Sequence, residues 1–224
     1  KEVGARPGWW HHSPEDTIDN VDMENFMMTL RTYAISFLRL LNCPILPFEF
    51  VSVADQFIET LTDLHKKGRG TIDLASVIHK AKAFKTKAER LEDMTSGLLS
   101  EYEESKGEKR SELEEIFRKI NDALMKLGRV LNPVLYQKSG RYGHDPESQV
   151  PNPIPVLQPM VELGDSQVLF SRSLDPESME FKALRTQLIR ERNKVSDALE
   201  TAMEIVESAI EGISDFSSCA RLNQ

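Results

Sequence analysis

The residues most able to do chemistry stand close to the start of the sequence, in the stretch WWHHSPEDT. His11 and His12 are adjacent, and imidazole is the commonest metal-binding side chain in proteins. Ser13, Pro14 and Asp16 form the pattern of a helix start, with a capping hydroxyl, a first-position proline and an acid three residues after the cap. The pattern therefore predicts a helix that begins after His12, and such a fixed chain direction suits a metal ligand. The alternative is that both histidines are ordinary surface or packing residues.

The overall charge of the chain excludes some classes of partner. The 224 residues carry a formal net charge of -8, whereas binders of nucleic acid or of anionic membranes have an excess of Lys and Arg. One Lys-rich stretch covers residues 80–87, but its lysines spread around the expected helix. No apolar run approaches the roughly 20 residues that a membrane-spanning helix needs. We therefore expect no nucleic-acid partner and no membrane span in this chain.

The two cysteines, Cys43 and Cys219, lie too far apart in the sequence for a metal-type or redox-type motif. They are either two reduced core thiols or one long-range disulfide. The sequence begins with Lys1 and shows no signal peptide, so we expect it to be a piece of a longer parent protein. The compartment stays open, and export of the parent is one alternative.

Apolar residues recur at spacings of three and four along most of the chain, which predicts amphipathic helices. Asp22, Thr71 and Asp175 are the expected N-caps of three of them. The stretch GRVLNPV, residues 128–134, reads as a turn, and residues 133–175 are Pro- and Gly-rich, with one short helix near residues 156–163. The main helices are expected over residues 23–41, 51–65, 72–98, 113–127 and 176–213.

These elements predict an all-α fold: a bundle of about five helices with one long Pro/Gly-rich loop. A sustained alternating pattern typical of a strand is not seen beyond residues 1–5, and no internal repeat is visible. A helical bundle by itself says little about function.

Three stretches of the sequence resemble one family. WWHHSPEDTIDNVD is similar to the segment that carries the last zinc-binding histidine of the zinc aminopeptidases and glutamate carboxypeptidases. ILPFEF is similar to that family's linker from the peptidase domain into a helical domain. INDALMKLGRVLNPVLYQ, followed by the Pro/Gly-rich loop and a long helix, resembles the dimerisation domain that glutamate carboxypeptidase shares with the transferrin receptor. The resemblance covers nearly the whole chain.

The resemblance implies a division of the chain. Residues 1–22 would be the C-terminal remnant, or short tail, of the α/β catalytic domain of a zinc peptidase. Residues 23–50 would be a connecting helix and Pro-rich linker. Residues 51–224 would be the transferrin-receptor-like helical dimerisation domain, which forms a homodimer.

The resemblance also assigns roles around the histidine pair. His12 would be the terminal zinc ligand, bound as a neutral imidazole, and His11 a neighbour rather than a ligand. Ser13, Asp16 and Thr17 would stabilise the turn, or would orient the metal-binding histidine without binding the metal themselves. The two tryptophans before the pair could wall off one side of a pocket.

The remaining parts of the family's zinc site are not found in this sequence. The family binds two zinc ions with two histidines and three carboxylates, and a further glutamate acts as general base. The His-x-Asp segment that supplies the first ligand is missing. The pairs Glu103–Glu104 and Glu114–Glu115 lie in highly charged stretches typical of a solvated helix face. We therefore predict no catalytic residue here, two zinc ions in the parent, and none bound by this chain alone.

In the family, a loop of the helical domain helps to shape the substrate pocket. Its counterpart here is SGRYGHDPESQV, in which Arg141, Tyr142 and His144 could contribute. Arg141 could pair with a carboxylate of the substrate. The Lys-Tyr pair of the carboxypeptidase has no evident match in this sequence, so the sequence does not establish a pocket specific for carboxylates. The alternative is an ordinary surface loop.

The first functional hypothesis is a helical dimerisation domain from the C-terminus of a zinc-dependent exopeptidase, either an amino- or a carboxypeptidase. The parent would hydrolyse peptide substrates, and this chain would lack a complete active site. A second hypothesis is a non-catalytic receptor-like or scaffold protein, as the transferrin receptor is among these relatives. A third is an unrelated bundle with an incidental histidine pair.

Overall fold

The computed structural model describes residues 8–145, 152–164 and 175–222. The chain divides into two compact units, Lys1–Cys43 and Pro44–Gln224. All regular structure in the described residues is helical, as six α-helices and two 3-10 helices, which confirms the predicted all-α bundle. The expected strand-like pattern of residues 1–5 lies outside the described residues. The α/β peptidase domain before the bundle stays a prediction.

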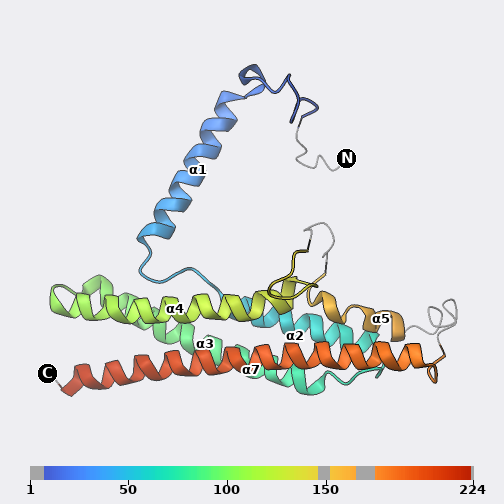
Figure 1. Ribbon diagram of the computed structural model, residues 1–224. Coiled ribbons are helices and arrows are strands. Elements are labelled where there is room, and N and C mark those ends of the chain that lie inside the picture. The colour runs from blue at the N-terminus through green and yellow to red at the C-terminus, as the bar shows by residue number, and fades with distance from the viewer. Residues whose placement is uncertain (1–7, 146–151, 165–174, 223–224) are drawn as a thin grey trace. The chain divides into compact units, whose positions relative to one another are not determined.

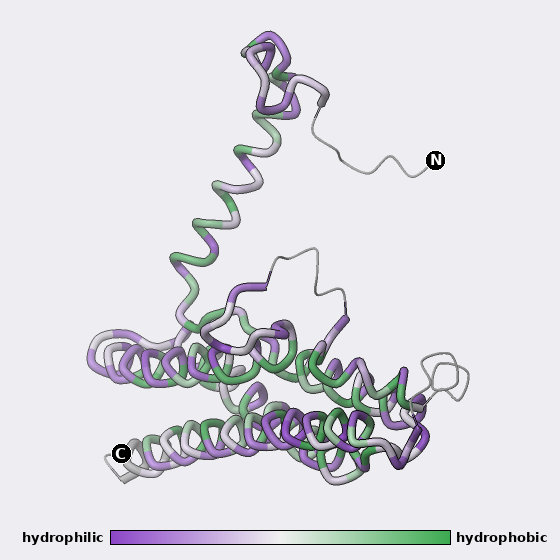
Figure 2. The backbone as a smooth tube through the Cα atoms, turned by 45° about the vertical axis from the view of Figure 1, so that its right-hand side comes forward, coloured by the Kyte–Doolittle hydropathy of each residue, from purple (hydrophilic) through white to green (hydrophobic). Residues whose placement is uncertain are grey.

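The first unit contains one long helix, α1 (Met23–Asn42), after a short 3-10 helix η1 (Ile18–Asn20). Asp22 is the N-cap, as predicted, and its Oδ1 accepts hydrogen bonds from the backbone N–H groups of Glu24 and Asn25 at 3.0 and 3.1 Å. No residue of α1 is buried. Apolar residues recur along the helix, as the green stretches of its backbone tube in Figure 2 show.

The second unit is built on four long helices that share one apolar core. Helix α7 packs along both α3 and α4, and α2 packs on α3 (Figure 1). The short helices η3 and α5 lie against the ends of the long ones, α5 on α2 and η3 on α4 and α7. The bounds are α2 Phe50–Lys67, α3 Ala75–Glu104, α4 Glu108–Tyr136, η3 Pro155–Leu157, α5 Pro159–Gly164 and α7 Met179–Leu222.

The core follows the apolar stripes of the sequence. Phe57 of α2, Phe84 of α3 and Leu199 of α7 are fully buried in a single cluster. Each stripe has helical spacing, so four helices together can cover each other's apolar faces. The helix expected near residues 156–163 is present as η3 and α5. Gly107 lies in the break between α3 and α4.

The turn expected at residues 128–134 was wrong, because α4 continues through that stretch to Tyr136 with Pro133 inside the helix. Proline in a helix interior costs about 3 kcal/mol, since it removes a hydrogen bond and crowds the preceding turn. Leu127, Leu131 and Leu135 are all fully buried. Their burial offsets the proline penalty, so the apolar stripe outweighs the local breaker.

Two of the predicted helix starts were also wrong. The Thr71 hydroxyl donates a hydrogen bond back to the carbonyl of Gly68 at 2.7 Å, and α3 begins only after Leu74. Likewise α7 begins at Met179 rather than directly after Asp175, and the Ser178 hydroxyl accepts from a backbone N–H inside the helix. In both places a polar residue that could have capped a helix forms a turn before it.

The linker that opens the second unit is held on α4 by one side chain. Asn121 accepts a hydrogen bond from the backbone N–H of Leu46 at 2.8 Å and donates one to the carbonyl of Pro44 at 2.9 Å. A side-chain amide that both accepts and donates satisfies two backbone groups of an extended segment at once. Asn121 therefore fixes the Pro-rich linker where it meets the bundle.

Lysines of the Lys-rich stretch of α3 form ion pairs with neighbouring helices of the bundle. Lys80 forms an ion pair with Glu200 of α7, and Lys87 forms one with Glu207 of the same helix. Lys85 pairs with Asp55 of α2 at 2.8 Å, which raises the pKa of the lysine above its ordinary value, mainly through that hydrogen bond. Within the described ranges, no helix has the length and apolar character to cross a membrane.

Candidate functional site

The site residues singled out in the sequence fall in two places, which belong to different units. His12 and its neighbours lie in a turn before α1, in the first unit. Arg141, Tyr142 and His144 lie in the loop after α4, in the second unit. Each place has its own geometry.

The turn before α1 is closed by hydrogen bonds of Ser13. Its hydroxyl donates to the carbonyl of Trp10 at 2.7 Å and accepts from the backbone N–H of Glu15 at 3.2 Å. The backbone N–H of Asp16 donates to the carbonyl of Ser13 at 3.0 Å. Ser13 thus bonds on both sides of itself, which is how Ser and Asp residues stabilise short turns.

The helix expected to begin at Ser13 is wrong. The chain makes turns through residues 9–15 and becomes helical only in η1. One side-chain bond of a capping box is nevertheless present in shifted form, because Asp16 accepts from the backbone N–H of His12, at 3.4 Å, rather than from that of Ser13. The side chains that would cap a helix stabilise a turn instead. Thr17 precedes η1 and its side chain makes no capping hydrogen bond.

His12 has a left-handed backbone conformation, with φ at 62°. Such angles are uncommon for residues other than glycine and cost free energy unless the surroundings hold them. The bond from its N–H to Asp16 and the bonds of Ser13 provide that hold. The imidazole of His12 is exposed, so the turn presents this ring to the outside of its unit.

His11 lies beside His12 with the two ring centroids 4.0 Å apart and the planes tilted by 60°. Its Nδ1 is 3.8 Å from the Asp16 carboxylate. Asp16 therefore contacts the backbone of one histidine and the ring of the other. Trp9 and Trp10 meet edge to face with centroids 5.9 Å apart, but Trp9 is 78% exposed.

The turn fits a metal ion in part. An exposed imidazole is a suitable zinc donor, and Asp16 fixes the backbone that carries it. A full structural or catalytic zinc site needs three or four protein donors. In the part of the chain that the structure describes, no three His, Cys, Asp or Glu side chains come together as such a set. His12 can thus supply one ligand of a larger site.

The loop after α4 is anchored by Asp145, a residue that sequence reasoning missed. Its carboxylate accepts hydrogen bonds from the backbone N–H groups of Lys138 and Ser139, at 2.6 and 2.9 Å. The bond from Ser139 is the main reason why the pKa of Asp145 lies below its ordinary value. The only hint in the sequence was an Asp-Pro step in a Gly-rich segment, which favours turns.

Two glycines shape the same loop. Gly140 has φ at 77°, a conformation that L-residues rarely adopt. The N–H of Gly143 donates to the carbonyl of Gly140 at 3.1 Å, and a Cβ on Gly143 would lie 2.7 Å from the carbonyl oxygen of Ser139. Glycine is therefore required at Gly143 because the chain folds back on itself.

The three predicted pocket residues of this loop do not converge on one point. Tyr142 is 92% exposed, and His144 is exposed as well. The Arg141 guanidinium lies 5.5 Å from the centroid of the Tyr142 ring. Arg141 lines a pocket of the second unit.

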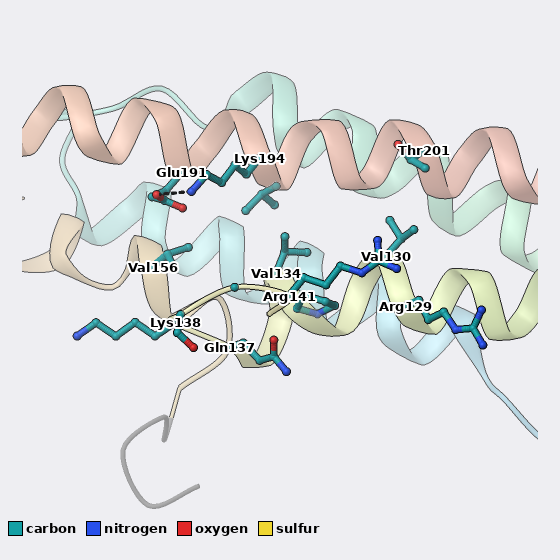
Figure 3. Close-up of a pocket in the computed structure, with 14 residues that line it drawn as sticks. Arg129, Val130, Val134, Gln137, Lys138, Arg141, Val156, Glu191, Lys194 and Thr201 are labelled. Carbon is teal, nitrogen blue, oxygen red and sulfur yellow. Dashed lines mark hydrogen bonds and ion pairs between the residues drawn. The ribbon is translucent and has the colours of Figure 1, made fainter. Parts of the chain in front are cut away.

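That pocket lies between the loop, α4 and α7, and has a volume of about 410 Å³. In Figure 3, Arg141 runs along α4 toward Val130, and Glu191 and Lys194 project from α7 on the opposite side. Glu191 and Lys194 form an ion pair at 2.8 Å. The pocket is apolar between these walls. The sequence had pointed to Arg141 in the loop, but no sequence pattern pointed to the α4 and α7 sides of the pocket. Its apolar lining comprises Val130, Pro133, Val134, Val156 and Val195.

The comparisons with known proteins leave the family open. No family model matches the chain, and no curated protein and no solved structure is similar to it at the level that counts as a match. The function therefore has to be argued from the two places described above.

Proposed function

We propose that this chain is the C-terminal part of a zinc-dependent exopeptidase, in which the helical unit assembles two copies. The observation that carries the proposal is the turn around His12. Ser13 and Asp16 hold a strained backbone so that one imidazole is exposed at a fixed point. A histidine that supplies one ligand to a larger metal site has to be held rigidly in this way. The same role is implied by the family that the sequence WWHHSPEDT resembles.

In the parent protein, His12 would be the terminal zinc ligand, as a neutral imidazole. Zinc in such a site lowers the pKa of a bound water and polarises the carbonyl that is attacked. Asp16 would keep the backbone of His12 in place, and His11 would remain a neighbour. The other ligands and the general base would come from the rest of the parent, so the isolated chain is expected to be inactive.

The apolar face of α1 supports the same proposal. Within the first unit, Phe26 and Leu30 are each 50% exposed, and Phe37 is 61% exposed. A helix with an uncovered apolar stripe is typical of a segment that packs against another part of its protein. Because α1 follows the His12 turn directly, the catalytic domain that shares the zinc site is the partner we propose for this face.

The loop after α4 would help to shape the substrate pocket of the parent. Tyr142 and His144 are exposed on a loop whose position Asp145 fixes. A fixed loop can present side chains to a substrate without a large loss of conformational entropy on binding. Whether the substrate loses its amino-terminal or its carboxy-terminal residue is a question for hydrolysis assays.

A groove between α4 and α7 supports the assembly role. Its volume is about 480 Å³, and its floor is apolar, with Ile116 and Ile120 from α4 and Ile205 from α7. Lys126 borders the groove on the α4 side and Glu204 on the α7 side. In a twofold dimer the α4 side of one copy can face the α7 side of the other, so these charges would be complementary.

The direct test uses the protein expressed from its own complete gene. Assays with amino-acyl and carboxy-terminal peptide substrates, with and without a chelator, should show chelator-sensitive hydrolysis. Light scattering on the 224-residue chain should give twice the monomer mass of 25.5 kDa at high micromolar concentration. A monomer at that concentration contradicts the assembly role. A dimer whose complete gene product neither binds zinc nor hydrolyses peptides would favour a receptor-like scaffold.

A further inference from the structure

We infer that the pocket between the loop after α4, α4 itself and α7 binds the carboxyl end of an apolar peptide or N-acyl amino acid. The inference shares Arg141 with the proposed function, but it needs neither zinc nor hydrolysis and concerns binding alone. It rests on the charges around the pocket, on the apolar residues inside it and on one buried acceptor without a donor.

The charges around the pocket favour an anion. Four cationic side chains line it and one acidic side chain does, although the whole chain has a net charge of -8. The acid, Glu191, is already paired with Lys194. Local positive charge on an acidic protein is a sign of an anionic ligand. The four cationic residues are Arg129, Lys138, Arg141 and Lys194.

The two arginines of the pocket have no carboxylate partner in the described parts of the chain. Among the described residues, neither Arg129 nor Arg141 forms an ion pair, and the contact found for the Arg141 guanidinium is the ring of Tyr142. A guanidinium presents a planar fork of donors that matches a carboxylate in a bidentate pair. Figure 3 shows Arg141 along the pocket wall, and Arg129 and Lys138 toward its opposite ends.

The inside of the pocket favours a ligand with an apolar body. Val134 and Val156 lie between the α4 side and the α7 side in Figure 3, and Val195 of α7 is fully buried beside them. The volume of about 410 Å³ lies within the range of small-molecule sites. An inorganic anion would leave Val134 and Val156, which are half-buried, without an apolar partner, whereas aliphatic side chains would bury them.

The side chain of Gln137 indicates that the ligand of this pocket carries a hydrogen-bond donor. Its side-chain carbonyl oxygen is buried and accepts no hydrogen bond within the described parts of the chain, and the residue lines the same pocket. Buried acceptors are nearly always bonded, so an unbonded one indicates a missing partner. The last residue of a peptide carries a carboxylate and an amide N–H on the same Cα. Arg141 would take the carboxylate and Gln137 the N–H.

The test is isothermal titration of the 224-residue chain with N-acetyl-valyl-valine, and with the same compound as its C-terminal amide. The acid should bind saturably, and the amide about tenfold or more weakly, because a charge-assisted hydrogen bond is lost. Equal binding of acid and amide, or no binding of the acid, overturns the inference. So does full displacement of the acid by inorganic phosphate at equal concentration.

Variants locate the site. Arg141→Gln and Arg129→Gln should each weaken binding of the acid about tenfold, and Gln137→Leu should weaken it less, because a neutral bond is lost. Arg118→Gln is the matched control, an exposed arginine on α4 outside the pocket, and should bind as the wild type does. Unchanged binding by both pocket arginine variants, with melting temperatures equal to the wild type, overturns the inference.

Discussion

Helices α1 and α4 carry apolar stripes of similar spacing, yet the two stripes have opposite surroundings, each within its own unit. On α4, Leu127 and Leu131 are fully buried. On α1, Leu30 is 50% exposed and Phe37 61% exposed. The comparison teaches that helical periodicity specifies which face of a helix needs a partner. It does not say whether the partner is in the same chain.

The difference follows from what each unit contains. In the second unit, four helices offer apolar faces to one another and close a common core. In the part of the first unit that the structure describes, residues 8–43, no second long helix accompanies α1. Most helical stability in proteins comes from packing of the apolar face, so α1 is expected to gain stability from a partner that covers this face.

The largest expected effect comes from truncating one phenylalanine in each region. Phe84→Ala should destabilise the second unit by about 3–5 kcal/mol, since it removes a fully buried ring from the core. Phe37→Ala in the same chain should change the free energy of unfolding by less than about 0.5 kcal/mol, because its ring is exposed within the first unit. Urea denaturation followed by circular dichroism measures both.

The same pair of variants tests the proposed partner of α1. In the complete parent protein, Phe37→Ala should become clearly destabilising, because the catalytic domain would cover the ring. Equal small effects of Phe37→Ala in the chain and in the parent would show that α1 is uncovered in both. A large effect already in the 224-residue chain would break the comparison between the two regions.

A smaller effect is expected at the linker, where the second unit begins. Asn121→Ala should cost about 1–3 kcal/mol, because it removes the partners of the Leu46 N–H and the Pro44 carbonyl. Asn132→Ala, at an exposed position of the same helix, is the control and should be close to neutral. Hydrogen exchange of the Leu46 amide should speed up only in the Asn121 variant. Exchange at the wild-type rate would show that the asparagine does not hold the linker.

The smallest effect concerns the loop after α4 and its dependence on pH. The folded pKa of Asp145 lies below its unfolded value, because its carboxylate accepts from the Ser139 and Lys138 backbone. The stabilisation it gives is therefore present above the unfolded pKa, about 3.9, and is lost as pH falls through the folded pKa. Carbon-13 NMR of the carboxyl group should show titration below that value. Titration at the ordinary value of an aspartate would contradict the anchoring role.

Much of the fold could be predicted from the sequence, because the apolar stripes specify which face of each long helix is to be buried. Asp22 was predicted as a cap and is one. The errors share one cause. At Pro133, Thr71 and Ser13 a local signal competed with its surroundings, and burial or turn bonding decided the outcome.

The candidate sites were less predictable. The His12 turn was found from residue types, although its left-handed backbone was not foreseen. The pocket that Arg141 lines was missed, because it combines residues of α4 with residues of α7 more than fifty positions apart. Periodicity indicates that two helices pack, but it does not give the register that brings Gln137 and Val195 to one cavity.

The most direct test of the central claim is the zinc content of the complete gene product, measured by elemental mass spectrometry, in three forms. Wild type and His11→Ala should hold zinc and hydrolyse peptides, since His11 is proposed to be a neighbour. His12→Ala should lose zinc and hydrolysis while its helix content stays the same. If His12→Ala keeps both its zinc and its rate, His12 is not a ligand and the proposed function is wrong.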